Sequence, residues 1–205
     1  MSGSGGDEGA SSARGDGSGA GDGAGADLDA RLAALAGRPM GSGAPHVAPD
    51  PVNLPMIRHW VAAFEDANPV YRDADAARSR FGGIVAPPLM LQTWTMATPK
   101  ISGIAERGGA PVEYGANPLA PLDDAGFIAT LATNSDFEIL RYLRLGEVIT
   151  STMVIESVSE LKQTRLGPGH FITWVTTYRD EQGEVVGRQM FRILKFKPDL
   201  EALLK

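Results

Sequence analysis

Cysteine is absent from this sequence of 205 residues, and histidine occurs only three times. Without cysteine the chain forms no disulfide and offers no thiol nucleophile, and this absence fits a reducing compartment. The histidines, His46, His59 and His170, are scattered and have no spacing typical of a metal site. We therefore expect a cytoplasmic protein without a bound metal ion.

An excess of basic residues and long apolar runs are also absent. The formal net charge is −6, which argues against a surface that binds nucleic acid. No run approaches the roughly 18 apolar residues of a membrane-spanning helix. The first residues lack the basic stretch and the apolar core of a secretory signal. The expected protein therefore binds neither nucleic acid nor a membrane.

Apolar side chains are rare in residues 1–47, where Gly, Ala, Ser and Asp dominate. Such a segment buries too little surface to offset its ordering entropy, so we predict a disordered tail over 1–47 and a folded domain over 48–205. One pattern in this segment instead predicts ordered structure. Leu28, Leu32 and Leu35 recur at i, i+4 and i+7, the spacing of a short helix that could dock on the domain.

Apolar periodicity predicts helices in the first part of the domain. Asn53 can cap a helix whose apolar side chains repeat at helical spacing up to Phe64, and a second helix is expected over Ala74–Phe81. Residues Leu89–Met96 are apolar nearly all round, as in a buried helix. The stretch Thr98–Asp124 is rich in Gly and Pro and predicts a long loop.

The remainder of the domain predicts β-strands. Four segments are rich in Val, Ile, Thr, Phe and Tyr, and one pair is separated by the turn Asp180–Gly183. The segments are Ala129–Leu140, Glu147–Lys162, His170–Arg179 and Glu184–Phe196. Because a sheet with one apolar face must bury that face, we expect an α+β fold in which an antiparallel sheet packs on the Leu89–Met96 helix.

Three segments together resemble the MaoC-like dehydratases. Residues Asp66–Asp73 follow a hydratase pattern of Asp-x-Asn-Pro-x-His-x-Asp, except that Tyr71 occupies the histidine position. The other segments are Asp50–Val61 and Gly82–Met90. The resemblance is greatest to the MaoC-type subunit of the two-subunit actinobacterial enoyl-CoA hydratases that act on steroid side chains. It implies a hot-dog fold, in which an antiparallel sheet wraps round one long buried helix.

The resemblance also implies a chemistry. Hydration of a 2-enoyl-CoA requires a group that deprotonates water and a donor that stabilises the thioester oxygen. Asp66 and Tyr71 occupy the acid–base positions, but a tyrosine, with an ordinary pKa of about 10, exchanges protons less readily near neutral pH than a histidine, with a pKa of about 6.5. Pro87 occupies the position whose backbone N–H would serve the oxygen, and proline has no N–H. We therefore interpret Asp66 and Tyr71 as a degenerate catalytic site.

Further residues are candidates for substrate binding. They are Asn68, Val85, Ala86, Pro87, Trp94, Arg165 and Lys195, of which the two cations could bind the phosphates of coenzyme A. Each has a plainer alternative. Asp66 and Asn68 can simply shape a turn, Trp94 can belong to the core, and the cations can lie on solvated strand edges.

The resemblance leads to three hypotheses. The first is a subunit of a heteromeric 2-enoyl-CoA hydratase, inactive alone, which builds the acyl tunnel for a steroid side chain or another bulky group beside a catalytic MaoC-like partner. The second is a self-sufficient, homodimeric (R)-specific enoyl-CoA hydratase or 3-hydroxyacyl dehydratase. The third is an acyl-CoA-binding module without turnover. In all three, coenzyme A enters as part of the ligand and no separate cofactor is expected.

Overall fold

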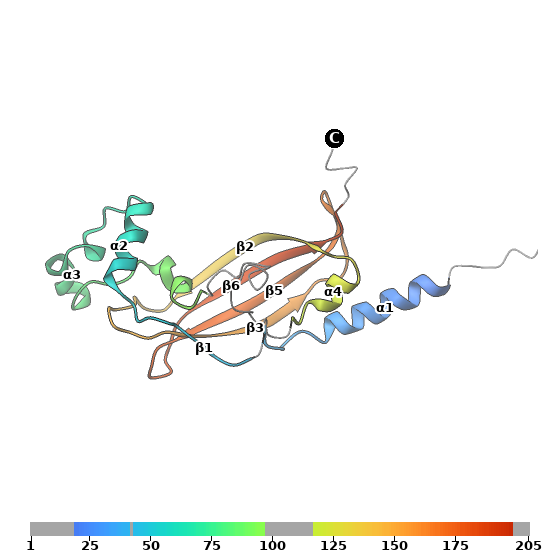
Figure 1. The fold of residues 1–205 in the computed structure, drawn as a ribbon, viewed down its shortest axis with the longest axis horizontal. Helices are drawn as coiled ribbons and strands as arrows, with labels where there is room; N and C mark the ends of the chain where they lie inside the picture. Colours follow the sequence, from blue (N-terminus) through green and yellow to red (C-terminus); the bar gives the residue numbers. More distant parts are fainter. Residues whose placement is uncertain (1–18, 42, 97–116, 199–205) are drawn as a thin grey trace, which may run out of the picture.

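The computed structural model describes residues 19–41, 43–96 and 117–198, in which helices lie at both ends of an antiparallel sheet (Figure 1). With η for a 3-10 helix, the elements are α1 (Gly19–Ala33), β1 (His46–Val47), α2 (Leu54–Ala63), η1 (Pro69–Tyr71), α3 (Ala74–Phe81), η2 (Pro88–Thr95), α4 (Ala120–Asp124), β2 (Ala129–Ile139), β3 (Thr150–Val158), β4 (Lys162–Thr164), β5 (Gly167–Arg179) and β6 (Val185–Phe196). Within the described ranges, no helix combines the length and the apolar character that crossing a membrane requires.

The six-stranded sheet has the order β1-β3-β5-β6-β2, with β4 paired to β5. Every strand pairing is antiparallel, which confirms the α+β class and the antiparallel sheet that the sequence predicts. The strand expected over Glu147–Lys162 is divided between β3 and β4. The division lies at residues 159–161, where three residues face two residues of β5 and the Ser159 hydroxyl accepts a hydrogen bond from the Phe171 N–H at 2.9 Å.

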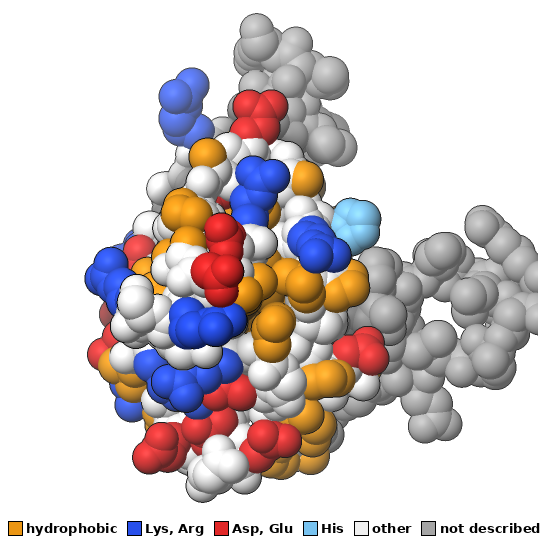
Figure 2. Space-filling model, turned by 90° about the vertical axis from the view of Figure 1, so that its left-hand side faces the viewer, with side chains coloured by type: hydrophobic (Ala, Val, Ile, Leu, Met, Phe, Trp, Pro, Cys, Tyr) orange, Lys and Arg blue, Asp and Glu red, His pale blue; other side chains and the backbone are white. Residues whose placement is uncertain are grey.

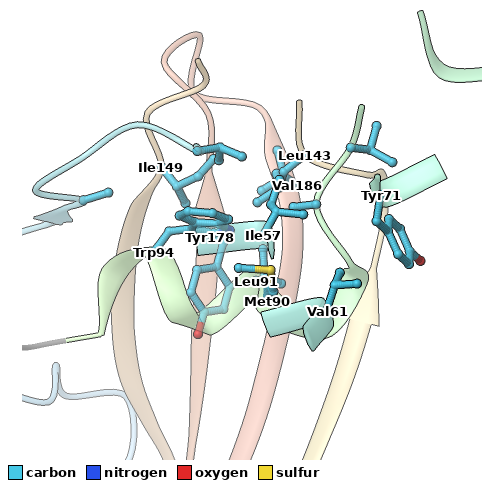
Figure 3. Packing of buried hydrophobic residues seen from close by; sticks show 14 residues of the cluster. Ile57, Val61, Tyr71, Met90, Leu91, Trp94, Leu143, Ile149, Tyr178 and Val186 are labelled. Atoms are coloured by element: carbon cyan, nitrogen blue, oxygen red, sulfur yellow. The ribbon is translucent and has the colours of Figure 1, made fainter. Parts of the chain in front are cut away.

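Two apolar clusters form the core. The first combines residues of α2 and η2 with residues from the nearby ends of the long strands, and Figure 3 shows its packing. Its buried members include Ile57, Val61, Met90, Leu91, Trp94, Ile149, Tyr178 and Val186. The second lies at the other end of the sheet, where α1 and α4 pack (Figure 1). Its buried members are Leu32, Leu35, Leu119, Leu122, Phe127, Ile155, Ile172 and Ile193.

The helices α2 and α3 form where the sequence predicts them. Asn53 caps α2, because its side-chain oxygen accepts a hydrogen bond from the Met56 backbone N–H at 3.0 Å. Ile57 and Val61 then pack inward. Phe64 differs from the expectation that it continues the apolar face: it is 66% exposed and stacks on Trp60, with the ring centroids 4.3 Å apart.

The buried helix is shorter and tighter than the expected long helix. Residues Pro88–Thr95 form the 3-10 helix η2, which follows Pro87 and has no side-chain cap. Met90, Leu91 and Trp94 are buried, whereas Leu89 and Met96 are exposed. Because a 3-10 helix has three residues per turn, Leu91 and Trp94 lie on one face, and Met90 extends the buried surface to the next face. The loop expected over Thr98–Asp124 falls mostly outside the described residues, and its last part forms α4.

The prediction of a disordered tail over 1–47 is wrong for its second half; residues 1–18 lie outside the described part. Residues Gly19–Ala33 form α1, and Leu32 and Leu35 are only 3% and 7% exposed. They are buried because the second apolar cluster offers them partners from the sheet and α4. The leucine spacing, and not the average composition of the segment, therefore indicates its structure.

The segment after α1 covers one edge of the sheet. Gly37 and Met40 donate backbone hydrogen bonds to Ile155 and Met153 of β3, and β1 pairs with the earlier part of the same strand. The other edge is β2, in which ten of the eleven residues pair with β6 and Thr133 lies at a bulge. Among the described residues, none pairs with the outer side of β2. The sheet can therefore be extended by another chain at β2.

Candidate functional site

The hydratase-like segment forms a corner between α2 and α3. Asp66 accepts a hydrogen bond from the Asn68 backbone N–H at 2.9 Å, and Asn68 accepts one from the Val70 N–H at 3.3 Å. Asp73 caps α3 by accepting from the Asp75 N–H at 2.8 Å. The carboxylates and the amide of the motif thus hold backbone donors at successive turns. This is the architectural role that was the plainer alternative for Asp66 and Asn68.

Tyr71 packs against the first apolar cluster and is 6% exposed. Burial raises the pKa of its hydroxyl above the ordinary value, and the neighbouring Tyr142 and Asp66 raise that pKa further. The hydroxyl is therefore neutral at physiological pH and cannot serve as a general base there. Figure 3 shows it turned away from Trp94 and Tyr178.

Asp66 lines a surface pocket of ≈ 530 Å³, which we call the motif pocket. Its other lining residues are Arg58, Val61, Ala62, Glu65 and Arg72. Neither arginine forms an ion pair with a described residue, although two carboxylates share the pocket. Figure 2 shows this end of the molecule, where side chains of both charges lie close together among apolar ones.

The backbone at Glu65 is unusual. It is the one described residue other than glycine with a positive φ, 53°, in the left-handed region that side chains disfavour. This conformation ends α2 and directs the chain into Asp66. Glu65 is thus the left-handed residue of a Schellman cap, in which its N–H donates to the Ala62 carbonyl at 3.3 Å and the Asp66 N–H donates to the Val61 carbonyl at 3.0 Å.

The turn at Pro87 offers no free backbone N–H that could donate a hydrogen bond to a thioester oxygen. Val85 forms a bridge with Arg144, and the Ala86 N–H donates to the Leu143 carbonyl at 2.9 Å. Pro87 and Pro88 have no N–H. Val85, Ala86 and Pro87 are all buried in the core and do not line the motif pocket.

The structure does not bring the two predicted phosphate-binding cations to the motif pocket. Lys195 is buried at the end of β6, where its ammonium group forms an ion pair with Asp123 of α4. Arg165 is exposed in the hairpin between β4 and β5, at the same end of the sheet. The motif pocket lies on α2, at the opposite end (Figure 1). In this structure Asp123 therefore neutralises Lys195, and the role of Lys195 in phosphate binding stays a prediction.

Sequence reasoning missed Arg58 and Arg72. Arg58 and Ala62 are four residues apart in α2 and so share one face of that helix, and Arg72 lies inside the motif itself. Charge on that face would have been the signal. Trp94, which the sequence does single out, is 5% exposed and packs in the first apolar cluster away from the motif pocket.

The family model described as "FAS1-like, dehydratase domain region" matches residues 40–189. A probable enoyl-CoA hydratase alpha subunit of Thermomonospora curvata is 43% identical over 175 residues, which are 84% of this chain and 53% of that protein. The 3-oxo-4,17-pregnadiene-20-carboxyl-CoA hydratase alpha subunit of Mycobacterium tuberculosis is 39% identical, over 83% of this chain and 53% of its own length. The chain thus spans about half the length of these relatives.

A solved structure is also similar. A chain in the crystal structure of the ChsH1-ChsH2 complex from Mycobacterium tuberculosis matches with a TM-score of 0.65 and 39% sequence identity. The match covers 86% of the present chain and 91% of that chain. The similarity therefore extends over nearly the whole described fold.

Proposed function

Because the chain belongs to the family of the FAS1-like dehydratase domain region and has the hot-dog fold of the MaoC-like dehydratases, we propose that it is the substrate-accommodating subunit of a heteromeric 2-enoyl-CoA hydratase. In this role it completes the acyl site, and a second MaoC-like chain supplies the acid–base pair. The chain by itself turns over slowly or not at all.

One observation carries this proposal: the corner of the hydratase motif is intact while both of its chemical functions are missing. Tyr71 replaces the histidine and is buried with a raised pKa, so it is no base at neutral pH. The turn Ala86–Pro88 has no free N–H for an oxyanion. Losing an oxyanion donor typically costs about 10²–10³ in rate, and losing an acid–base group about 10²–10⁴.

The open edge at β2 is where the catalytic partner would join. Its eleven residues contain no lysine, arginine or proline, which commonly protect an exposed edge from pairing, and a partner strand would have to accommodate Asp136, Glu138 and the bulge at Thr133. The opposite edge is covered by the segment that follows α1. Pairing through β2 would thus give a single, defined heterodimer contact, consistent with the name of the similar complex.

The proposed substrate is a bulky 2-enoyl-CoA, and a steroid side-chain thioester is the specific candidate because a relative bears that kind of name. Coenzyme A would be part of the substrate, with no other cofactor, and the cytoplasm remains the expected compartment. Arg58 and Arg72 in the motif pocket replace Lys195 as the cations to test for contact with the phosphates.

The test compares the chain alone with the chain co-expressed with candidate partners that carry an Asp-x-Asn-Pro-x-His segment. Hydration of enoyl-CoA thioesters is followed by loss of absorbance of the conjugated thioester. We expect turnover of about 1–10³ per second only in a complex. Such turnover by the lone chain would favour the self-sufficient hydratase, and tight acyl-CoA binding with no turnover in any complex would favour the binding module.

A further inference from the structure

The edge strand β2 carries a row of side chains on the outer face of the sheet, the face turned away from η2, and two of them are matched by arginines of β6 (Figure 1). Glu138 lies opposite Arg188, and the two form an ion pair at 2.6 Å. Asn134 lies opposite Arg192, which donates a hydrogen bond to the Asn134 side-chain oxygen at 3.0 Å. These two cross-strand pairs, one on each side of Asp136, tie the edge strand to its neighbour.

Asp136 is the unmatched member of this row. It lies opposite Met190, which has no charge, and it forms no ion pair with any residue that the structure describes. Its neighbours in the strand point to the inner face, where Ser135 accepts a hydrogen bond from Gln189 and Phe137 packs against the first apolar cluster. The exposed carboxylate of Asp136 is therefore available to a strand that is added at the free edge.

A strand added at β2 would remove Asp136 from much of its water. The residue would then have a strand on each side, each about 4.8 Å away. Covering an ionised carboxylate is costly unless a positive group compensates it, because its hydration is lost without replacement. Arg188 and Arg192 are already bonded to Glu138 and Asn134. The compensating charge must therefore come from the added strand.

We propose that β2 pairs with a strand of the partner subunit that carries a lysine or an arginine opposite Asp136. This inference rests on the proposed function, in which the partner joins at β2, and it specifies the chemistry of the partner at that edge. A second copy of this chain cannot supply the cation through the same edge in any register, because β2 contains no lysine or arginine. The edge therefore favours a different chain over self-pairing.

The first test needs neither the catalytic partner nor activity, because a variant of this chain can carry the missing cation. The unchanged full-length chain is labelled at its N-terminus with a fluorophore, and its anisotropy is followed during titration with unlabelled unchanged chain, Asp136→Lys or Glu181→Lys. Two copies pair antiparallel about a two-fold axis, and an axis at position 136 brings the introduced ammonium group opposite Asp136. Thermal unfolding establishes that each variant is folded.

We expect Asp136→Lys to bind the labelled chain at least about tenfold more tightly than the unchanged chain does, and we expect high salt to reduce this gain. Glu181→Lys alters the net charge equally, at an exposed carboxylate in the hairpin between β5 and β6, and should bind like the unchanged chain. Equal binding of Asp136→Lys and the unchanged chain, or an equal gain with Glu181→Lys, would overturn the proposal.

The second test uses the complex with the catalytic partner that co-expression identifies. Asp136→Asn should weaken this complex at least about tenfold, mainly through faster dissociation, because the cation of the partner is then covered without its counter-charge. Glu181→Gln, the control, should leave the affinity unchanged. Asp136→Lys should weaken the complex further, and a change of the facing cation of the partner to glutamate should restore it.

An affinity that is unchanged or higher in Asp136→Asn would refute the assignment and would identify Asp136 as a charge that only protects the edge. A set of complexes that hydrate no enoyl thioester would instead refute the proposed function. The titration of the labelled chain would then still decide how β2 pairs.

Discussion

Leu91 of η2 packs directly onto Gly187 of β6. A Cβ atom at Gly187 would lie 2.6 Å from the Leu91 Cδ2 atom and 2.8 Å from the Glu138 carbonyl oxygen. The absence of a side chain at this one position allows η2 to approach the sheet. The first apolar cluster, including Trp94, is therefore positioned by a contact between a leucine and a glycine on different elements.

Gly187→Ala should consequently destabilise the fold by about 1–3 kcal/mol, the range for overpacking a well-packed core. The Glu138 side of the clash is backbone, which yields less easily than a side chain. Urea unfolding followed by tryptophan fluorescence measures the change. Gly83→Ala is the matched control, because a Cβ there meets no atom within 4 Å and the backbone is not left-handed. Equal stabilities of the two variants would contradict the role of the Leu91–Gly187 contact.

Leu32→Ala should lower the free energy of unfolding by about 2 kcal/mol, near the low end for a buried leucine because α1 lies at the periphery. The exposed Ala34→Ser is the control in the same segment. Removal of residues 1–35 should lower the melting temperature by several degrees for the same reason. An unchanged melting temperature would restore the interpretation of the whole segment as a disordered tail.

We expect the free energy of unfolding to decrease at acid pH because of the Asp180 carboxyl group. Burial by itself raises the pKa of this carboxyl group, but hydrogen bonds from Arg141 and from the backbone N–H groups of Glu184 and Gln182 outweigh burial and lower it. With a folded-state pKa below the unfolded value of about 3.9, its contribution is complete above that pH and is lost as the pH falls through the folded-state pKa.

The measurement is urea unfolding of Asp180→Asn and the unchanged chain between pH 7 and pH 3. The free energy of unfolding of Asp180→Asn should be lower than that of the unchanged chain by a constant amount down to about pH 4. Below that pH the difference should become smaller. Gln182→Ala, which changes an exposed uncharged side chain on the same hairpin and keeps the backbone N–H that bonds to Asp180, should show no pH-dependent difference. A deficit that grows in acid would mean that the sign of the pKa shift is wrong.

Asp66→Asn should reduce turnover of the complex less than tenfold, which corresponds to about 1.4 kcal/mol. The reason is that asparagine keeps the side-chain oxygen that accepts from the Asn68 N–H. The same change at the partner's catalytic aspartate should cost far more. Loss of turnover with fold and partner affinity retained would identify Asp66 as a working acid–base group and would favour the self-sufficient hydratase.

Much of the fold follows from local sequence patterns. The cap at Asn53, the helix over Ala74–Phe81 and the Asp180–Gly183 turn depend on side chains that bond to backbone nearby in sequence. The strands follow from residues that suit a half-buried pleated surface. The proposed degeneracy of the site is also predicted from the sequence, because Tyr71 is not a histidine and Pro87 has no backbone N–H whatever their surroundings.

Only the tertiary structure decides which of these residues meet. Lys195 is neutralised by Asp123, which precedes it by 72 positions, so its charge in the sequence says nothing about its availability. The burial of Leu32 requires a surface built by distant strands. That the Trp94 indole N–H finds no acceptor among the residues that the structure describes also depends on its neighbours in space. Chemical capacity is a property of the residue, whereas burial, pairing and access depend on contacts that the linear sequence does not specify.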